Sequence, residues 1–300
     1  MKKQRIDTLL VEKGLCPSRQ QAQRLIRAGE VKVSHQIIDK PGTPVAVDAA
    51  IELKQKPPFV SRGGEKLARA LKVFNINPVG RVCLDGGIST GGFTDCLLQA
   101  GAKRVYGVDV GYGQVAWKIR QDSRVVLKER TNIRHLTPED LFNKRDGDKE
   151  NGEEDNGEQE RPTLGVMDVS FISLVKVLPA FWSLLSGEKE VVLLVKPQFE
   201  VGKDKIGKNG VVRDHKVQAG AIDQVMQAAA QLGWQYQGLT WSETVGPAGN
   251  IEYLLWLTAG VGRDISTLDN SSTKDTLQKE WPTVEDLRSL TYQAHQALIK

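Results

Sequence analysis

The sequence predicts an α/β fold with a mostly parallel sheet, preceded by a small α+β domain. Three observations support this prediction. Apolar strand-like runs alternate with helical patterns through the body of the chain, one of these strands runs into a glycine-rich loop, and the N-terminal stretch combines two helices with short strands. A chain of 300 residues is also long enough for about two domains.

The first domain is expected over residues 1–58, including a linker. Its first helix is expected to end at Gly14, and its second helix has Ser18 as a candidate N-cap and Gly29 after its last turn. The paired prolines of Lys54–Pro58 favour an extended connection. The expected elements are the helices Arg5–Lys13 and Gln20–Ala28 and the strands Val31–Val33, Gln36–Ile38, Val45–Val47 and Ile51–Leu53.

The body of the chain, residues 59–260, begins with a helix at Glu65–Phe74 and then alternates between strand and helix signals. The expected strands are Val82–Leu84, Val105–Val108, Val125–Lys128, Leu164–Asp168, Val191–Val195 and Tyr253–Leu257. The expected helices between them are Thr94–Ala100, Leu174–Leu185 and Gln218–Leu232. This alternation favours a parallel sheet with helices on both faces.

The glycine-rich loop predicts a nucleotide-type pocket. The stretch VCLDGGISTGGFTD, residues 82–95, runs from strand to loop to helix, which is how α/β sheets build such pockets. It lacks the G-x-G-x-x-G spacing of dinucleotide sites and instead reads Asp85-x-Gly87-x-Ser89-x-Gly91. Asp109 ends the next strand, where an acid commonly binds ribose hydroxyls. An adenosine cofactor is expected, and a glycine turn without a ligand is the alternative.

Four charged residues lie at the ends of apolar segments. Asp168 ends the strand LGVMD, Lys196 ends VVLLVK, Glu252 begins IEYLLW, and Lys66 lies at the start of a helix. Ligands bind outside the carboxyl ends of parallel strands, so Asp168 and Lys196 are expected beside the glycine loop. A structural ion pair is the alternative for each of them alone.

The charge of the chain is unevenly distributed. Residues 1–60 carry 11 Lys and Arg against 6 Asp and Glu, whereas residues 145–161 carry 8 acids against 3 bases. A basic body indicates a polyanionic partner, with charge for solubility alone as the alternative. Residues 145–161 are expected to form a disordered acidic insertion, and residues 261–300 a flexible tail with a C-terminal helix that begins at the Thr283–Asp286 capping box.

Composition excludes several classes of protein. No apolar run approaches the roughly 20 residues of a membrane helix, and the basic N-terminus lacks the apolar core of a secretory signal. Cys16, Cys83 and Cys96 are scattered and show no metal-binding spacing. We therefore expect a cytoplasmic protein without a metal site and without membrane attachment. The oligomeric state cannot be predicted.

Two family resemblances sharpen these expectations. RIDTLLVEKGLCPSRQQAQRLIRAGEVKV resembles the S4 RNA-binding domain. The body of the chain resembles the FtsJ-like 2′-O-ribose methyltransferases in the motifs SRGGEKL, DGGISTGGFTD, GVDVGYGQ, ERTNIR, DVSFISL, KPQFEVGK, GVVRD and GNIEYLLW. The two domains together resemble the hemolysin-like TlyA family. The resemblance implies a Rossmann-like S-adenosylmethionine (SAM) methyltransferase that acts on ribosomal RNA, with a cytidine ribose as the expected target and ribosomal subunits as partners.

The resemblance also implies roles for individual residues. The family's catalytic tetrad corresponds to Lys66, Asp168, Lys196 and Glu252. A lysine beside a second cation can accept or steer the proton that the 2′-hydroxyl loses as it attacks an electrophilic methyl. The expected cofactor-binding residues are Asp85, Gly87, Ser89, Gly91, Gly92, Phe93 and Asp109. The expected RNA-binding residues are Arg5, Arg19, Arg24, Arg27, Lys32, Arg62, Lys203 and Lys205.

Three other functions stay open at this point. A non-catalytic RNA-binding factor for ribosome assembly would need the S4 domain but not the tetrad. An NAD oxidoreductase is disfavoured by the missing G-x-G-x-x-G spacing. A membrane-acting hemolysin is suggested only by the family's name.

Overall fold

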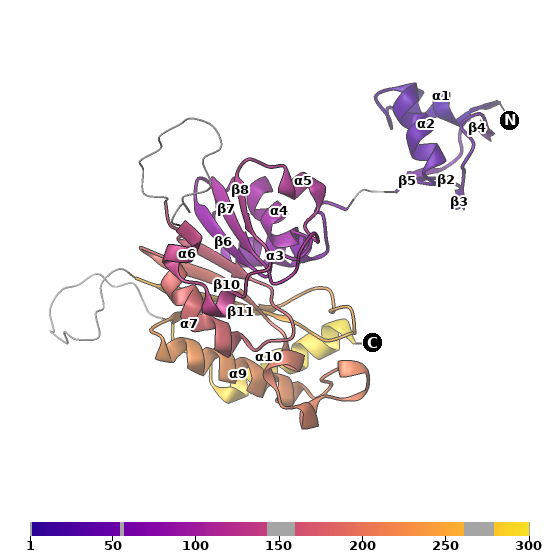
Figure 1. Ribbon diagram of the computed structural model, residues 1–300. Coiled ribbons are helices and arrows are strands. Elements are labelled where there is room, and N and C mark those ends of the chain that lie inside the picture. Colours follow the sequence, from indigo (N-terminus) through magenta and orange to yellow (C-terminus); the bar gives the residue numbers. More distant parts are fainter. Residues whose placement is uncertain (1, 55–56, 143–159, 261–278, 300) are drawn as a thin grey trace, which may run out of the picture. The chain divides into compact units, whose positions relative to one another are not determined.

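The computed structural model describes residues 2–54, 57–142, 160–260 and 279–299, and it divides into two compact units (Figure 1). Unit 1 is Met1–Pro57 and unit 2 is Pro58–Lys300. Most of the predicted acidic insertion and the first part of the predicted tail lie outside the described residues.

Unit 1 packs two helices against short strands. The N–H of Gln21 donates to Ser18 Oγ at 3.3 Å, so the predicted N-cap is confirmed, and Gly14 and Gly29 follow their helices with φ of +70° and +69°. The first helix begins at Ile6 and not at Arg5, because Arg5 pairs with Pro44 at the end of a strand. The elements are β1 (Lys3–Arg5), α1 (Ile6–Glu12), α2 (Arg19–Arg27), β2 (Val31–Val33), β3 (Gln36–Ile37), β4 (Pro44–Ala46) and β5 (Ile51–Leu53).

Unit 2 is built on a seven-stranded sheet in the order β11-β12-β10-β9-β6-β7-β8. Its strands are β6 (Val82–Gly86), β7 (Arg104–Val108), β8 (Val125–Lys128), β9 (Leu164–Met167), β10 (Lys189–Val195), β11 (Gln235–Trp241) and β12 (Tyr253–Ala259). The neighbouring strands β10–β9, β9–β6, β6–β7 and β7–β8 pair in parallel, whereas β12 runs antiparallel to both of its neighbours, β10 and β11. The predicted mostly parallel sheet is therefore confirmed, although β11 was not predicted.

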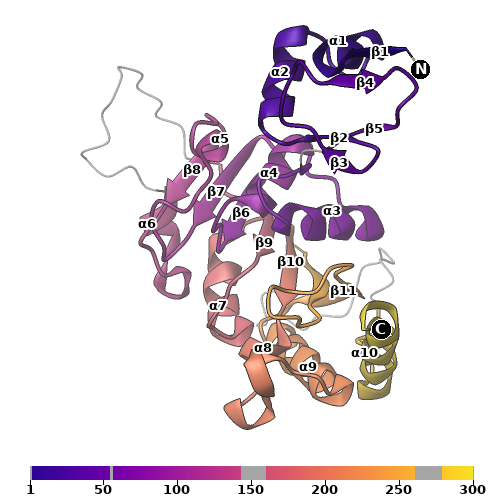
Figure 2. The ribbon, with the colours of Figure 1, turned by 90° about the vertical axis from the view of Figure 1, so that its right-hand side faces the viewer.

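Helices cover both faces of this sheet (Figures 1 and 2). Successive residues of a strand point to opposite faces, so Val191 and Leu193 join a different apolar cluster from Val192 and Leu194. One face packs against α3 (Gly63–Phe74), α4 (Gly92–Gln99) and α5 (Trp117–Arg120). The other face packs against α6 (Pro138–Phe142), α7 (Leu174–Leu184) and α9 (His215–Gln231). The shorter helical turns are η1 (Ile133–His135), α8 (Pro197–Glu200), η2 (Lys203–Lys205) and η3 (Lys208–Gly210).

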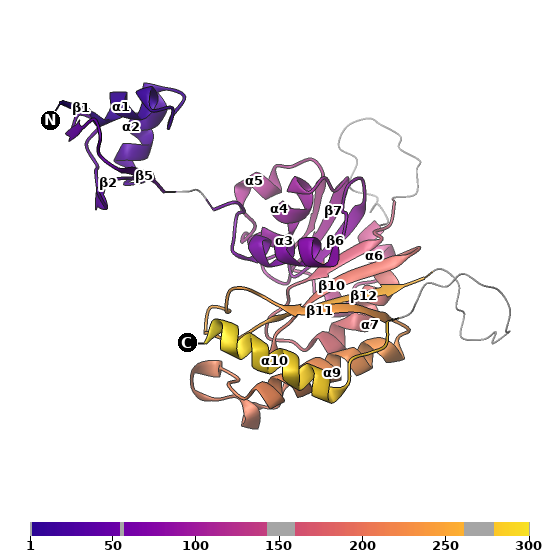
Figure 3. The same cartoon turned by 180° about the vertical axis from the view of Figure 1, so that it is seen from behind.

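The C-terminal helix α10 (Val284–Leu298) lies alongside α9 (Figure 3). Its capping box between Thr283 and Asp286 is present as predicted. Leu287 and Ala294 are buried in the same apolar cluster as α9, so this helix is part of the packed unit. Every helix in the described part of the chain is too short or too polar to cross a membrane.

Candidate active site

The glycine loop between β6 and α4 needs glycine for reasons of space as well as conformation. Gly87 has a φ of +87°, and a Cβ there would lie 2.6 Å from the carbonyl oxygen of Asp168. A Cβ at Gly92 would overlap Ser61 Oγ and lie 2.9 Å from the amide nitrogen of Gly64. The loop is thus in close contact with Asp168 on one side and with the start of α3 on the other.

Gly86 and Ile88, the residues on either side of Gly87, are both buried. A Cβ at Gly86 would lie 2.7 Å from the ring of Phe181, so a larger residue would have to displace this buried ring. Ile88 is 3% exposed and packs against Gly107 of β7. The bulk of Ile88 is therefore largely accommodated in the core.

Asp109, at the end of β7, holds two backbone segments together. Its carboxylate accepts hydrogen bonds from the N–H of Ser89 and from the N–H of Gly111, each at 2.7 Å. Ser89 has a φ of +49°, a left-handed conformation that is uncommon for a residue with a side chain. The carboxylate therefore stabilises the loop conformation and still has lone pairs that can accept from ribose hydroxyls.

A hollow of about 570 Å³ lies between the glycine loop, the end of β7 and the segment after β9. This volume is within the range of pockets that hold small molecules. Gly87, Ser89 and Asp109 line it, and so do Thr131, Asn132 and Phe171, which the sequence reasoning did not assign individually. The hollow can accommodate a nucleoside-sized ligand with Asp109 on its wall.

A second hollow of about 210 Å³ lies between the glycine loop and the start of α3. It is lined by Arg62 and Lys66 on the α3 side and by Gly92 and Phe93 on the loop side. Gly87, Ser89 and Asp168 line both hollows. Asp168 therefore lies where the two hollows meet.

Two ion pairs involve the four charged residues predicted to be catalytic. Lys196 Nζ lies 2.6 Å from Asp168 Oδ1, and Lys66 Nζ pairs with Glu252 Oε2. Lys66 and Glu252 are 9% and 2% exposed, so their pair is almost entirely buried. Lys196 also donates to Ser170 Oγ at 2.9 Å, a partner that the sequence reasoning missed although Ser170 lies within the quoted DVSFISL stretch.

The antiparallel direction of β12 explains why Glu252 belongs to this site. In the sheet, Val195 at the end of β10 is paired with Tyr253 at the start of β12. Lys196 and Glu252 are the next residues outward on the two strands, so both leave the sheet at the same edge. A parallel β12 would have carried Glu252 to the opposite edge.

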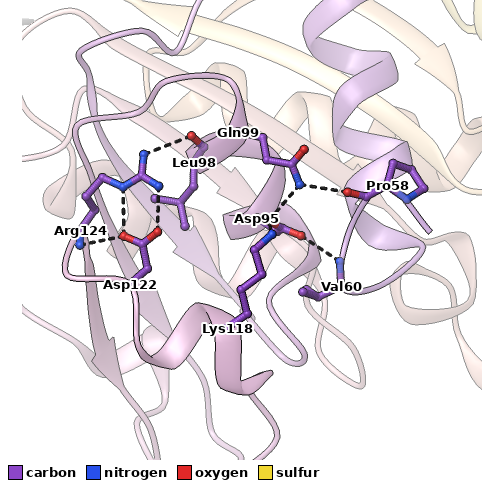
Figure 4. A network of polar contacts seen from close by, with 8 residues as sticks. All are labelled: Pro58, Val60, Asp95, Leu98, Gln99, Lys118, Asp122 and Arg124. Atoms are coloured by element: carbon purple, nitrogen blue, oxygen red, sulfur yellow. Dashed lines mark hydrogen bonds and ion pairs between the residues drawn. The ribbon is translucent and has the colours of Figure 1, made fainter. Parts of the chain in front are cut away.

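The segment that leads into α3 is attached to α4, as Figure 4 shows. The N–H of Val60 donates to Asp95 Oδ2 at 2.9 Å, and Gln99 Nε2 donates to the carbonyl oxygen of Pro58 at 2.9 Å. Lys118 pairs with Asp95 at 3.0 Å. Burial of Asp95 is outweighed by the hydrogen bonds from Gln99 and Lys118, which lower the pKa of its carboxyl group. These contacts fix the start of α3, and hence Lys66, relative to the glycine loop.

Asp85, predicted to bind the cofactor, lies beneath the loop and lines neither hollow. Its side chain is 0% exposed, and Oδ2 accepts a hydrogen bond from Thr94 Oγ1 at 2.6 Å. Burial raises the pKa of Asp85 to about 7. Gly91 also lines neither hollow, and with a φ of +96° it caps the start of α4.

An exposed aromatic residue borders the larger hollow. Phe171 is 92% exposed, has a φ of +64° and lies 5.2 Å from the ring of Phe199. A bulky residue with positive φ is strained, and such strain often marks a functional segment. The sequence contains no local signal for this conformation.

The residues predicted to bind RNA are distributed over both units. Arg5, Arg19, Arg24, Arg27 and Lys32 are exposed on unit 1. In unit 2, Arg62 lines the smaller hollow, and Lys203 and Lys205 are exposed on η2. The loop that follows η2 is held by Asn250, whose side chain accepts from the N–H of Val212 and donates to the carbonyl of Gly210, both at 2.9 Å.

In the described residues, no group of three or more His, Cys, Asp and Glu side chains could hold a metal ion.

Comparisons with known proteins agree with this architecture. A family model described as FtsJ-like methyltransferase matches residues 59–259, and an S4 domain model matches residues 4–51. The 16S/23S rRNA (cytidine-2′-O)-methyltransferase TlyA of Mycobacterium tuberculosis is 45% identical over 264 residues, which cover 87% of this chain and 92% of the relative.

Two further relatives match over nearly the whole chain. YqxC of Bacillus subtilis, described as a candidate rRNA methyltransferase, is 42% identical over 96% of this chain and 98% of its own length. The solved structure of a candidate hemolysin from Streptococcus thermophilus is 37% identical, with a TM-score of 0.66, and the match covers 99% of this chain and 97% of that one.

Proposed function

Because the chain belongs to the FtsJ-like methyltransferase family and carries an S4 domain, we propose that it is a SAM-dependent 2′-O-methyltransferase of ribosomal RNA, with cytidine as the target nucleotide. The observation that carries the proposal is the meeting of the two hollows at Asp168, with Lys196 bound to that carboxylate. One hollow can hold the cofactor, and a target ribose can enter beside it.

The larger hollow fits the adenosine part of SAM. Asp109 can accept hydrogen bonds from the ribose hydroxyls, and Gly87 allows the ligand to approach the backbone because it carries no side chain. When bound, SAM supplies an electrophilic methyl group on a sulfonium. The junction of the two hollows is the position at which a methyl group and a ribose can be held together.

Lys196 is the residue proposed to act on the target hydroxyl. Asp168 and Ser170 hold its Nζ, and as a neutral amine this nitrogen can accept the proton that the 2′-hydroxyl loses while its oxygen attacks the methyl group. The carboxylate of Asp168 then stabilises the ammonium that results. Lys66, paired with Glu252, provides a second cation on the wall of the smaller hollow. The main contribution of these residues is to align the ribose oxygen with the methyl group.

The experiment combines cofactor binding with mapping of methylation. Purified protein is incubated with SAM carrying a labelled methyl group and with ribosomal subunits from cells that lack the gene, and 2′-O-methylated nucleotides are mapped by mass spectrometry. We expect label on a cytidine ribose, and calorimetry should show binding of SAM but not of NAD. Absence of ribose methylation on both subunits and on free rRNA would contradict the proposal.

The cofactor assignment has its own control. Asp109→Ala should weaken SAM binding by about 10-fold or more, because the ribose hydroxyls and the loop both lose the carboxylate that accepts their hydrogen bonds. Asp122→Asn changes an acid that pairs with Arg124 and does not line the hollow, so SAM affinity should stay within about 2-fold. Equal SAM affinity of the Asp109 variant and the wild type would show that the adenosine does not bind at Asp109.

A further inference from the structure

A buried carboxylate in unit 1 connects two of the arginines predicted to bind RNA. Asp7, in the first turn of α1, is 0% exposed. Its Oδ1 accepts from Arg5 Nε at 3.1 Å, and its Oδ2 accepts from Arg5 Nη2 at 3.0 Å, from Arg19 Nε at 2.9 Å and from Gln23 Nε2 at 3.0 Å. One carboxylate thus joins the end of β1 to the first two turns of α2.

The contacts of Asp7 are strong enough to fix the two arginines. The hydrogen bond from Arg5 outweighs the burial of the carboxylate and, with the bonds from Gln23 and Arg19, holds the pKa of Asp7 well below its ordinary value. Asp7 is therefore charged at neutral pH, and charged hydrogen bonds are the stronger kind. The guanidinium of Arg5 also lies close to Gly42, where an added Cβ would be 3.1 Å from Arg5 Nη1.

Most donors of the two guanidinium groups remain available. A guanidinium has five N–H bonds. Arg5 uses two of them on Asp7 and Arg19 uses one. The two side chains are 51% and 56% exposed, so their other N–H groups are accessible to a ligand. Two arginines against one carboxylate also leave the cluster with a net positive charge.

The arrangement extends along α2. Arg19, Gln23 and Arg27 are spaced four residues apart, so they lie along one side of the helix. Asp7 binds the first two of these side chains and thereby sets the position of the row relative to Arg5. Planar guanidinium groups held in fixed orientation suit phosphate oxygens, which they can bind with two parallel hydrogen bonds.

We infer that Asp7 is a positioning residue for RNA binding: it orients Arg5 and Arg19 so that their free N–H groups meet the phosphates of the RNA backbone. This inference rests on the proposed function, because it needs RNA as the ligand. It assigns to an acidic residue a favourable role in binding a polyanion, which charge alone would not suggest.

The sign of the effect of Asp7→Asn tests the inference. This variant makes unit 1 more positive by one charge, so attraction between net charges alone predicts tighter RNA binding. Loss of positioning predicts weaker binding, by about 10-fold, because both arginines lose their fixed orientation. Affinity for rRNA is measured with the full chain by fluorescence anisotropy at fixed salt.

Glu12→Gln is the matched control for charge. Glu12 is an exposed acid on the same helix, α1, and its side chain has no hydrogen bond or ion pair with any other described residue. Its neutralisation adds the same positive charge without changing Asp7. RNA affinity should therefore stay within about 2-fold of the wild type or increase slightly. Equal or tighter RNA binding by folded Asp7→Asn would overturn the inference.

A second pair of variants covers the case in which Asp7→Asn fails to fold. Arg19 is half-exposed, so Arg19→Lys and Arg19→Gln should both fold. A lysine has all its donors on one nitrogen, so an ammonium group bound to Asp7 leaves no planar fork for a phosphate. Arg19→Lys should therefore lose about as much RNA affinity as Arg19→Gln, on the order of 10-fold. Near wild-type affinity of Arg19→Lys would show that only its charge matters and would overturn the inference.

Failure of the proposed function gives a different result. If the wild-type chain does not bind rRNA at all, the RNA-binding role of the whole domain is wrong, whatever the variants do. If the wild type binds rRNA and only the predicted differences between variants are absent, the positioning role of Asp7 is wrong and the proposed function stands. Thermal unfolding of each variant, monitored by circular dichroism, identifies the temperatures at which all are folded.

Discussion

Lys196 Nζ lies 2.6 Å from Asp168 Oδ1, and these two residues follow neighbouring parallel strands, β10 and β9. Their pairing is a direct consequence of the sheet, because parallel strands present their carboxyl ends at one edge. The pair borders the larger hollow through Asp168 and Ser170, which lies on the same wall. This relationship underlies the first prediction.

Lys196→Met should reduce methyl transfer by about 100-fold or more, since a side chain of similar length remains but cannot act on the hydroxyl. SAM affinity should stay within about 3-fold, because Lys196 does not line the larger hollow. Single-turnover methylation and calorimetry measure the two quantities. Lys189→Met, at the other end of β10, is the control and should retain the wild-type rate. A wild-type rate for Lys196→Met would remove Lys196 from the mechanism.

Gly87→Ala should destabilise unit 2 far more than Gly80→Ala. Both glycines have positive φ, but nothing lies within 4 Å of a Cβ at Gly80, whereas a Cβ at Gly87 would meet the backbone oxygen of Asp168 at 2.6 Å. We expect a loss of about 1 kcal/mol for Gly80→Ala from conformation alone and at least about 3 kcal/mol for Gly87→Ala. Urea unfolding of both variants makes the comparison, and equal losses would show that the loop can move away from Asp168.

Lys66 and Glu252 should be strongly coupled in a double-mutant cycle. Each single variant, Lys66→Met or Glu252→Gln, leaves a buried charged group without its opposite charge, which costs about 3 kcal/mol or more. The double variant should lose clearly less than the sum of the two single losses. Chemical unfolding of the wild type and of the three variants supplies the losses, and additive losses would mean that the pair contributes no mutual stabilisation.

Asp85 should make the stability of unit 2 depend on pH. Burial raises its pKa to about 7 in the folded state, above the ordinary value of 3.8, so its carboxyl group favours folding when protonated and disfavours folding when charged. The contribution to stability is complete at acidic pH below the unfolded pKa, and it is lost as the pH rises through about 7.

Asp85→Asn should remove this dependence, since an amide does not titrate. Its free energy of unfolding should change less than that of the wild type between about pH 5 and about pH 8. Asp223→Asn, on α9, serves as a control and should keep the wild-type slope. Parallel pH profiles of the Asp85 variant and the wild type would show that Asp85 titrates normally in the folded protein.

Local sequence signals predicted much of the fold. Ser18, Gly14, Gly29 and the capping box at Thr283 mark helix ends in the structure as they do in the sequence, because caps depend on a few neighbouring residues. Apolar runs located six of the seven strands of the large sheet. The strand β11 was missed because all but one of its residues are only partly buried and its apolar pattern is weak.

Contacts between distant segments could not be predicted in the same way. Nothing near Asp85 in the sequence shows that it lies under the loop and not on a wall of a hollow, because its burial depends on packing around β6. The exposure and positive φ of Phe171 likewise depend on the loop after β9. The roles assigned to the site residues stay predictions until the variants above are measured.

The sequence by itself determined the glycine loop, the alternation of strands and helices, and the charged residues at strand ends, because each is set by residues close together in the chain. Only the tertiary structure decided the pairing of these charges. Lys66 meets Glu252 because β12 runs antiparallel to β10 and carries Glu252 to the edge at which Lys196 leaves the sheet. Strand direction is set by packing over the whole sheet, so no local pattern of residues encodes it.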